Sequence, residues 1–331
     1  MTAIDADEGK LRFTAIAPTR SVPDMAQDVR NGLSLTPKVL HPKYFYDERG
    51  SQLFDQICDT PEYYLTRVES ELLSRHASDI LLLSQPANII ELGSGASRKS
   101  RLLLDVWHST DVQTYLPYDV SEEMLTAVSK QLTHDYPALN VHGLVGDYTA
   151  GLEHLPKVDG TSLWVFIGST LGNFEPVDAQ AFVTDIASQL APGDYFLLGT
   201  DLHKSETVLE PAYNDAQGLT AAFNLNVLSA INASLNADFD LDAFSHLAYY
   251  CEGRRRIEMH LVSKKDQQVT LRDLDLTVSF TQEEKMRTEI SRKFLTSEIS
   301  EMLRTAGLNV VESFCHDQFP YALTLARKDG D

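Results

Sequence analysis

The fold of this 331-residue chain is decided by the stretch NIIELGSGAS, residues 88–97. Its apolar first half is typical of a short buried strand. The two glycines that follow predict a tight turn in which no Cβ blocks a ligand lying against the backbone. Residues 101–107 have the apolar density of a helix packed on a sheet, and the N-terminus of that helix would direct free N–H groups at the turn. The stretch therefore favours a nucleotide site in an α/β fold.

The glycine turn alone is a weak signal, because an ordinary strand-to-helix turn also uses Gly-x-Gly. The dinucleotide-binding fingerprint requires a third glycine where this chain has Arg98. The next apolar strand ends at Asp119, about two dozen residues beyond Gly95, where doubly wound folds place a carboxylate that accepts hydrogen bonds from ribose hydroxyls. Together with Glu91 before the glycines, this arrangement resembles the class I S-adenosylmethionine-dependent methyltransferases.

Composition restricts the classes of partner. Hydrophobic residues make up 43% of the chain, and its length suits one large domain plus a smaller one. The formal net charge of −20 argues against binding nucleic acid or an anionic membrane. The three cysteines have neither disulfide nor zinc spacing. Because the sequence lacks a signal peptide and an apolar run of roughly 20 residues, we expect a soluble, cytoplasmic monomer.

From residue 88 to about residue 203, strands and helices alternate, which predicts a parallel sheet with helices on both faces. The alternation then stops, and the following insertion carries a helical stretch over residues 207–233 and several short strands. After the insertion, the α/β fold resumes with a helix that ends at Gly307 and a final hairpin whose last strand is antiparallel. The expected strands cover residues 88–92, 113–118, 140–145, 162–167, 195–201, 246–251, 256–263, 269–271, 276–280, 308–315 and 321–326.

The segment before the first of these strands is expected to be mostly irregular and rich in aromatic residues. Its first dozen residues read as loose, residues 35–47 and 61–65 read as aromatic loops, and residues 51–58 fit a short helix. Thr66 and Glu69 have the spacing of a capping box, which predicts that the next helix begins there.

Four stretches narrow the resemblance to one family. In their order along the chain, and with the sequence from about residue 30 to the end, they look like the histidine-specific α-N-methyltransferases of ergothioneine biosynthesis. That family transfers three methyl groups in turn to the α-amine of L-histidine, giving the betaine hercynine. The stretches are PEYYLTR at residues 61–67, ELGSG at 91–95, FIGSTLGN at 166–173 and MRTEISRKF at 286–294.

The resemblance implies a doubly wound, Rossmann-like class I methyltransferase sheet with an antiparallel last strand, plus a smaller α+β substrate-binding domain. It also implies S-adenosylmethionine as the cofactor, no metal, and L-histidine as the small-molecule substrate. We assign residues 1–65 and 204–292 to the substrate-binding domain, and residues 66–203 and 293–331 to the methyltransferase domain.

Substrate-site residues follow from the same resemblance. Asn173 and Tyr213 match the residues that hold the substrate carboxylate, whereas Glu289 and Ser291 match those that hold the imidazole. Aromatic side chains of the N-terminal segment would surround the amine, and the first of them would also accept or relay its proton. The aromatic residues are Tyr46, Phe54 and Tyr63, and the remaining expected contacts are Met259 beside the ring, Gly168 and Thr170.

The cofactor site is expected along the carboxyl ends of the first three strands. Asp147 would accept a hydrogen bond from the exocyclic amine of adenine while Tyr148 covers one face of the ring, although an Asp at this position is also common in plain turns. The cofactor residues are Gly93, Ser94, Gly95, Lys99, Asp119, Asp147 and Tyr148.

Several residues also permit simpler interpretations. Glu289 would have only a structural role if it formed a salt bridge with Arg287 or Lys293 on a strand surface. Asn173 would do so if it only bracketed a loop, and Met259 if it only filled the core. The histidines that we leave structural, because they lack metal-ligand spacing, are His41, His203, His246 and His260.

Three other functions compete with histidine methylation. The same scaffold could methylate another aromatic amino acid, such as tryptophan or tyrosine, or stop before the third methyl group. A nicotinamide-dependent dehydrogenase is disfavoured by the missing third glycine. A non-catalytic ligand-binding module is disfavoured by the intact set of site residues.

Overall fold

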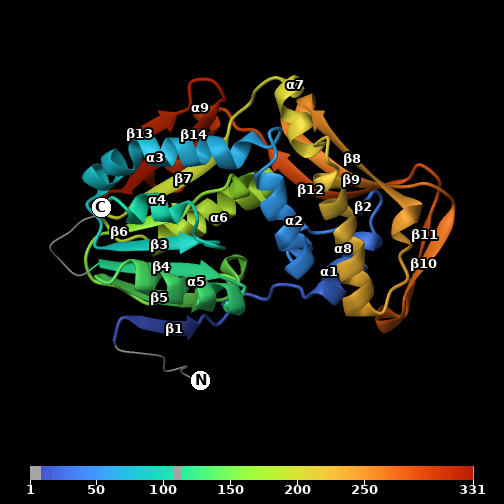
Figure 1. Ribbon diagram of the computed structural model, residues 1–331, viewed down its shortest axis with the longest axis horizontal. Coiled ribbons are helices and arrows are strands. Elements are labelled where there is room, and N and C mark those ends of the chain that lie inside the picture. The colour runs from blue at the N-terminus through green and yellow to red at the C-terminus, as the bar shows by residue number, and fades with distance from the viewer. Residues whose placement is uncertain (1–8, 108–112, 331) are drawn as a thin grey trace.

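The computed structural model describes residues 9–107 and 113–330, in which the strands form an eight-stranded sheet, a four-stranded sheet and a two-stranded ribbon (Figure 1). The large sheet has the strand order β1-β5-β4-β3-β6-β7-β14-β13. Its strands are β1 (Leu11–Ala15), β3 (Asn88–Leu92), β4 (Gln113–Asp119), β5 (Leu139–Val145), β6 (Ser162–Phe166), β7 (Tyr195–Asp201), β13 (Leu308–Cys315) and β14 (Tyr321–Lys328).

The pairing within this sheet confirms the predicted fold class. β1, β5, β4, β3, β6 and β7 are mutually parallel, whereas β14 runs antiparallel to β7 and β13 runs antiparallel to β14. The chain reverses its direction of winding between β3 and β6, which makes that point the switch where ligands of such sheets bind.

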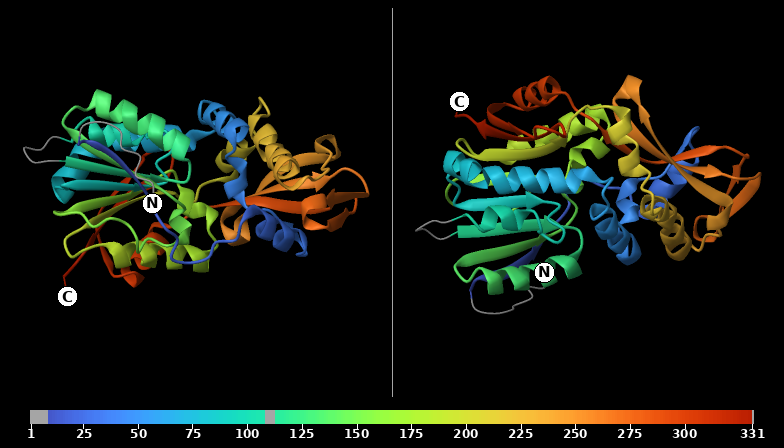
Figure 2. Two further views of the ribbon diagram at one scale, coloured as in Figure 1. Left: turned by 90° about the horizontal axis from the view of Figure 1, so that it is seen from below. Right: turned by 45° about the horizontal axis from the view of Figure 1, so that its top comes forward.

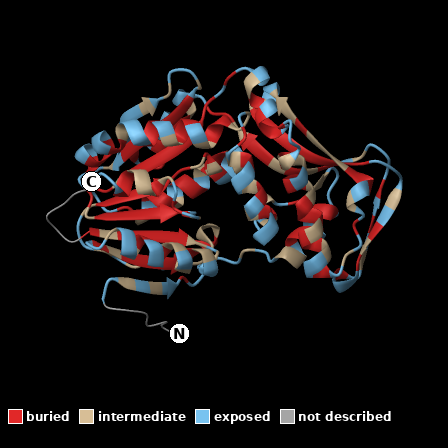
Figure 3. Ribbon diagram, viewed as in Figure 1, coloured by how far each residue is buried: buried red, intermediate tan, exposed pale blue. Residues whose placement is uncertain are grey.

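Helices cover both faces of the large sheet because its strands are apolar on both sides (Figures 2 and 3). Ile89 packs with the first layer of helices, whereas its neighbour Ile90 packs with the second. The first layer contains α3 (Tyr64–Ser84), α4 (Ser100–Leu104) and α5 (Glu122–Asp135), and the second contains α6 (Pro176–Gln189) and α9 (Thr296–Thr305).

The remaining elements form a second lobe, which we define as residues 25–58 and 204–292 and which lies at the right of Figure 1. β2 pairs in parallel with β12, with Val39 opposite Arg287, so the N-terminal segment and the insertion share one sheet. The lobe contains α1 (Met25–Leu33), β2 (Lys38–Val39), α2 (Glu48–Cys58), α7 (Glu206–Leu209), α8 (Leu219–Leu235), β8 (Phe244–Cys251), β9 (Arg256–Ser263), β10 (Gln267–Leu271), β11 (Leu276–Phe280) and β12 (Lys285–Arg292).

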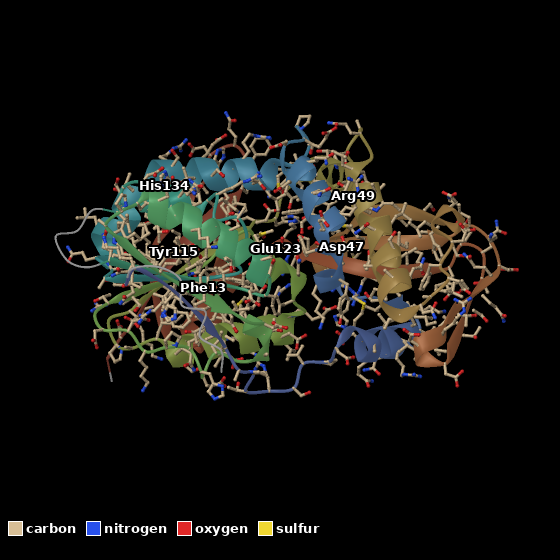
Figure 4. The ribbon with its side chains drawn as sticks, turned by 60° about the horizontal axis from the view of Figure 1, so that its bottom comes forward. Phe13, Asp47, Arg49, Tyr115, Glu123 and His134 are labelled. Carbon is tan, nitrogen blue, oxygen red and sulfur yellow. The ribbon has the colours of Figure 1, made fainter. Side chains whose placement is uncertain are left out.

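Helices α2 and α8 are joined inside this lobe by a shared polar residue. Asp47, labelled in Figure 4, caps α2 by accepting from the Gly50 amide at 2.7 Å. The same carboxylate oxygen accepts from the Asn226 side chain of α8 at 2.7 Å. The cap therefore also fixes the aromatic N-terminal segment against the insertion.

The start of α3 differs from the expected capping box. The helix begins at Tyr64, and the Thr66 hydroxyl donates to Cys58 Sγ at 3.2 Å instead of capping the helix. Glu69 is buried and accepts from groups of other elements. The prediction was wrong because Thr66 and Glu69 have the spacing of a capping box by coincidence. Both side chains form hydrogen bonds to other parts of the chain instead of capping the helix.

The helix expected over residues 207–233 is broken into three pieces. Pro211 lacks a backbone N–H and starts a short 3₁₀ turn, Pro211–Tyr213, and Gly218 then adopts a φ of 73° before α8 begins. Three strands were not expected from the sequence: β1, at an edge of the large sheet, β2, at an edge of the small sheet, and β12, inside the small sheet.

None of the helices in residues 9–107 and 113–330 is long and apolar enough to span a membrane. The division of the chain into a cofactor-binding and a substrate-binding domain stays a prediction.

Candidate active site

The glycine turn after β3 is held against the end of β4. Gly93 and Gly95 adopt left-handed backbone conformations, with φ of 70° and 49°, which glycine tolerates without strain. The Gly95 amide donates to Asp119 Oδ2 at 2.8 Å. A Cβ built on Gly95 would meet no heavy atom within 4 Å, so the backbone there is open to a ligand. The structure thus brings the turn and Asp119 together.

Ser94 provides a test of whether the turn fits a bound cofactor. Its side chain is buried, and its hydroxyl has no hydrogen-bond partner among the described residues. A buried polar group without a partner costs about 1–3 kcal/mol, so a polar ligand atom would stabilise it. Buried Glu91, by contrast, accepts from Ser100 and from Tyr115, the latter labelled in Figure 4, and burial raises the pKa of Glu91 to about 7. Glu91 therefore ties the turn to its neighbours and does not face a ligand.

Asp147 and Tyr148 lie at the end of β5. Asp147 Oδ1 accepts from the amide and the hydroxyl of Thr149, at 2.7 and 2.5 Å, and the described residues leave Oδ2 without a partner. The Tyr148 ring packs on Phe166 with 5.7 Å between centroids, and its edge lies 3.4 Å from where a Cβ of Gly93 would be. Tyr148 is therefore next to the glycine turn, and Asp147 keeps one oxygen available.

A buried carboxylate connects the glycine turn to the loop after β6. Glu69 of α3 accepts from the Gly168 amide at 2.8 Å and from the Tyr321 hydroxyl at 2.5 Å. Lys99 makes a salt bridge to the same carboxylate. A Cβ on Gly168 would lie 3.2 Å from Thr170 Oγ1 and 3.4 Å from Lys99 Nζ. Lys99, Gly168 and Thr170 are therefore brought together, and sequence reasoning missed the residue that joins them.

Gly172 brings the loop after β6 into contact with β12. It lies in the 3₁₀ turn Thr170–Asn173, and a Cβ there would be 3.0 Å from the Arg292 carbonyl oxygen and 3.2 Å from the Arg292 nitrogen. The same Cβ would be 3.7 Å from Ser291 Oγ. This close approach places Asn173, the next residue, at the junction with β12. Among the described residues its side-chain amide has no hydrogen-bond partner.

Replacing Gly172 with alanine is expected to destabilise the protein by about 1–3 kcal/mol, because the new methyl group would press on backbone atoms of β12. The matched control is Gly253→Ala, since a Cβ on Gly253 meets nothing within 4 Å. We expect the control to stay within about 0.5 kcal/mol of the parent. Denaturant unfolding measures both changes, and equal effects would contradict the close contact.

Aromatic rings from the N-terminal segment and from the insertion form a continuous chain beside this junction. Tyr46 lies 5.5 Å from Phe54, Phe54 lies 6.0 Å from Tyr63, and Tyr63 lies 6.2 Å from Tyr213, measured between ring centroids. Phe223 of α8 closes the group, with centroids 5.6 Å from Tyr46 and 5.9 Å from Phe54. All four aromatic residues expected in the substrate site are therefore together. Phe223 was not predicted from the sequence to belong to this group.

The phenols of this group stay protonated near neutral pH. Burial, followed by the Glu289 carboxylate, raises the pKa of Tyr46 well above its ordinary value, and burial likewise raises the pKa of Tyr63. Nevertheless Tyr46, taken as a whole residue, is 49% exposed. Tyr46 therefore lies at the exposed end of the chain of rings, whereas Tyr63 is partly buried.

Strand β12 presents the expected imidazole-binding residues on one face. The register shifts between Arg287 and Glu289, and the intervening Thr288 donates to the Met259 carbonyl at 3.2 Å. Such a bulge re-aims the residues that follow it. Glu289 and Ser291 are two residues apart and therefore point to the same side of the strand. Met259 lies opposite Glu289 on β9 and is buried.

The ion pairs that would make Glu289 structural are formed by other residues. Arg287 pairs with Glu175 at 3.2 Å, and Lys293 pairs with Asp201 at 2.9 Å. The described chain provides Glu289 itself with no salt bridge. Burial raises the pKa of Glu289 to about 7, although the Lys293 charge opposes this shift. A ligand N–H that donated to this carboxylate would lower its pKa again, because such a hydrogen bond favours the charged form.

A buried polar network lies directly beneath these side chains, and sequence reasoning missed it. The Tyr213 hydroxyl donates to Ser291 Oγ at 2.8 Å, and Lys293 contacts both hydroxyls. Asp201, at the carboxyl end of β7, pairs with Lys293 and with Lys204. The position of Asp201 at a strand end was the available signal, because that edge of the sheet carries the ligand site.

No group of three potential metal-ligating His, Cys, Asp or Glu side chains occurs within residues 9–107 and 113–330. The expectation of a metal-free site stays a prediction.

Comparison with known proteins gives a consistent family. A family model described as histidine-specific, S-adenosylmethionine-dependent methyltransferase matches residues 25–328. The chain is 41% identical over 305 residues to a histidine N-alpha-methyltransferase of Mycobacterium tuberculosis, covering 92% of this chain and 95% of the relative. It is 42% identical over 303 residues to a protein of the same name from Mycolicibacterium smegmatis, covering 91% and 94%. It is 30% identical to ergothioneine biosynthesis protein 1 of Neurospora crassa, covering 88% of this chain and 33% of that longer protein.

Proposed function

The chain belongs to the family of histidine-specific, S-adenosylmethionine-dependent methyltransferases, and we propose that it methylates the α-amine of L-histidine three times, giving hercynine. The product would enter ergothioneine biosynthesis. The observation that carries the proposal is the convergence of Tyr213, Ser291 and an ion-pair-free Glu289 with the chain of aromatic rings.

The cofactor would lie across the carboxyl ends of β3, β4 and β5. When bound, S-adenosylmethionine supplies a sulfonium methyl group that an amine attacks in line. We assign Ser94 and the Gly95 backbone to its amino-acid end together with Lys99. Asp119 would hold the ribose, because a carboxylate that accepts one amide bond still has lone pairs for hydroxyls. Asp147 and Tyr148 would hold the adenine.

The aromatic rings would surround the amine of the substrate. They exclude water and place the nitrogen for attack, which is where most of the rate of such a transfer arises. Each added methyl group removes a hydrogen-bond donor, and the trimethylated nitrogen is a fixed cation. Aromatic faces stabilise such a cation by about 0.5–2 kcal/mol each. The Tyr46 phenol stays protonated, so it would relay the amine proton by donating its own hydrogen to water as its oxygen takes up the proton of the amine.

The two ends of histidine would meet opposite walls of the site. Asn173 and Tyr213 would bind the carboxylate, while Glu289 and Ser291 would bind the imidazole above Met259. Leaving the Glu289 carboxylate unpaired costs about 1–3 kcal/mol or more, and this penalty would disfavour a side chain with no N–H in the right place. A tryptophan or tyrosine substrate, or only one or two transfers, is the alternative.

Mass spectrometry of the purified protein with S-adenosylmethionine and all twenty amino acids tests the proposal. We expect a gain of three methyl groups on histidine alone. Methylation of another amino acid, or an accumulation of the mono- or dimethylated product, would keep the cofactor assignment and overturn the assignment of the substrate pocket. Absence of any methylated product would overturn the proposed function itself.

The variant Asn173→Ala is expected to bind histidine roughly 10–150-fold more weakly, because a hydrogen bond to a carboxylate contributes about 1.5–3 kcal/mol. Binding of S-adenosylhomocysteine should stay within about twofold, since Asn173 lies on the β12 side of the site. Titration calorimetry measures both affinities. Asn309→Ala, on the exposed strand β13, is the matched control. An equal loss of both affinities would instead assign Asn173 to the cofactor site.

We also propose, from the sequence, that the two-domain division holds and that the protein acts as a cytoplasmic monomer without nucleic-acid, membrane or metal partners. Size-exclusion chromatography with light scattering tests the monomer.

A further inference from the structure

The network beneath the substrate site contains two lysines and one aspartate, all almost fully buried. Lys293 Nζ lies 2.9 Å from Asp201 Oδ2, and Lys204 pairs with Oδ1 of the same carboxylate. The Tyr64 hydroxyl donates to Asp201 Oδ2 at 2.6 Å, and Lys204 also donates to the Leu202 carbonyl at 2.7 Å. Of the two lysines, Lys293 is the one for which the described residues show hydrogen bonds to the proposed substrate site.

The hydrogen bonds of Lys293 are fully assigned. An ammonium group has three donors and no acceptor. The three partners are Asp201 Oδ2 at 2.9 Å, Ser291 Oγ at 2.9 Å and the Tyr213 hydroxyl at 3.2 Å. Each hydroxyl that accepts from Lys293 must direct its own O–H elsewhere. Tyr213 now donates to Ser291 at 2.8 Å, which leaves the Ser291 hydrogen for a further acceptor.

We propose that Lys293 is a positioning residue that makes Tyr213 and Ser291 hydrogen-bond donors toward the amino-acid substrate. The inference rests on the proposed function. A substrate carboxylate, which only accepts hydrogen bonds, would draw the Tyr213 hydrogen away from Ser291. Ser291 would then donate to the ring nitrogen that carries a lone pair.

The donor direction also determines which form of the imidazole binds. In neutral imidazole one nitrogen accepts and the other donates. If Ser291 donates to the first, the N–H of the second faces Glu289, which lies two residues before Ser291 on the same face of β12. The site thus takes a neutral ring in a single tautomer, together with a free carboxylate. Amino acids whose carboxyl group is blocked or absent would lose the Tyr213 interaction.

A pair of matched variants tests this role. Lys293→Met and Lys204→Met each remove one positive charge and one partner of Asp201, but only the first removes donors to Tyr213 and Ser291. We measure the binding of histidine and of histamine, which lacks the carboxylate, by calorimetry with S-adenosylhomocysteine bound. Lys293→Met should weaken histidine binding at least about tenfold more than Lys204→Met does, which corresponds to about 1.4 kcal/mol.

Histamine binding should change less than histidine binding in Lys293→Met. The affinity for histidine divided by the affinity for histamine should therefore fall. A double-mutant cycle between Lys293→Met and Ser291→Ala should show losses that do not add. Equal losses in the two lysine variants, or additive losses in the cycle, would overturn the inference.

Binding of S-adenosylhomocysteine reports whether each variant is folded. If Lys293→Met no longer binds S-adenosylhomocysteine, Lys293→Arg replaces Lys293→Met as the test. Arginine keeps the charge beside Asp201 but presents a planar fork in place of a tetrahedral ammonium. Histidine binding at least about tenfold weaker in Lys293→Arg, with cofactor binding intact, supports the inference. Full histidine affinity in Lys293→Arg overturns it. A parent protein that binds no histidine at all would overturn the proposed function as well, which separates the two failures.

Discussion

The variant Asp201→Asn is expected to lose about 3–5 kcal/mol of unfolding free energy, because it leaves two buried lysines without their counter-ion. Burial alone would raise the pKa of Asp201, but Lys293 and Lys204 outweigh it and hold the pKa below its ordinary value. The carboxylate is therefore ionised, and its contribution is fully present, at every pH above about 4.

The loss should shrink as the pH rises from 6 to 9. Burial lowers the pKa of Lys204 to about 8, although Asp201 opposes this. A lysine whose folded pKa lies below its unfolded value carries a penalty that is full at low pH and is relieved as the pH passes through the folded pKa. Without Asp201 that relief should become larger, because the uncompensated lysines deprotonate more easily.

Denaturant unfolding at pH 6, 7.5 and 9 measures both effects, and Asp194→Asn is the matched control. Asp194 precedes the same strand and is also buried, but its partners are the backbone amides of Ser162 and Ala191 at 2.8 and 2.9 Å. Its replacement should cost about 1–3 kcal/mol with little dependence on pH. If the two variants lost equal stability, the lysine pair would not depend on Asp201.

The second large effect is expected for Glu289→Ala, which should narrow the preference for histidine over tryptophan by roughly 10–100-fold. The carboxylate has no salt bridge within the described chain, and burial raises its pKa to about 7. An imidazole N–H would be its partner, and losing a hydrogen bond to a charged group costs about 1.5–3 kcal/mol. Indole gains relative to imidazole because the truncated site no longer penalises it.

A competition assay with equal concentrations of the two amino acids, followed by mass spectrometry, measures the preference directly. Glu289→Gln keeps the shape and should fall between the parent and the alanine variant. Glu312→Ala removes a carboxylate from exposed strand β13 and should leave the ratio unchanged. A preference that stays constant in Glu289→Ala would refute the imidazole role.

Much of the large sheet was predictable because its strands are apolar on both faces and end in turn residues. β3 and β7 have the predicted bounds, residues 88–92 and 195–201. β1, β2 and β12 were not predicted, because each depends on a partner strand that is distant in sequence. Polar residues dominate β12, and only its pairing with β9 and β2 makes it a strand with half of its residues buried.

The candidate site shows the same limit. The resemblance supplied Tyr46, Glu289 and their neighbours, but Asp201 and Lys293 were passed over. Charged side chains are mostly exposed in proteins, so a single sequence offers no reason to bury these two. The contacts of Glu69 with Gly168 and Tyr321 were missed for the opposite reason. The sequence suggested a local role for Glu69 in a capping box, so no distant partner was expected.

The pairing of β2 with β12 has a consequence for how the chain acquires its shape during synthesis. Val39 cannot find its partner until Arg287 has been made, about 250 residues later. At about 5–20 residues per second this interval is roughly 10–50 s. Meanwhile Leu40, Phe45 and Leu53, which are buried in the finished protein, have no insertion to pack against. The ribosome therefore produces the aromatic half of the site long before its other half. During this interval the nascent chain exposes an apolar segment that a chaperone can shield.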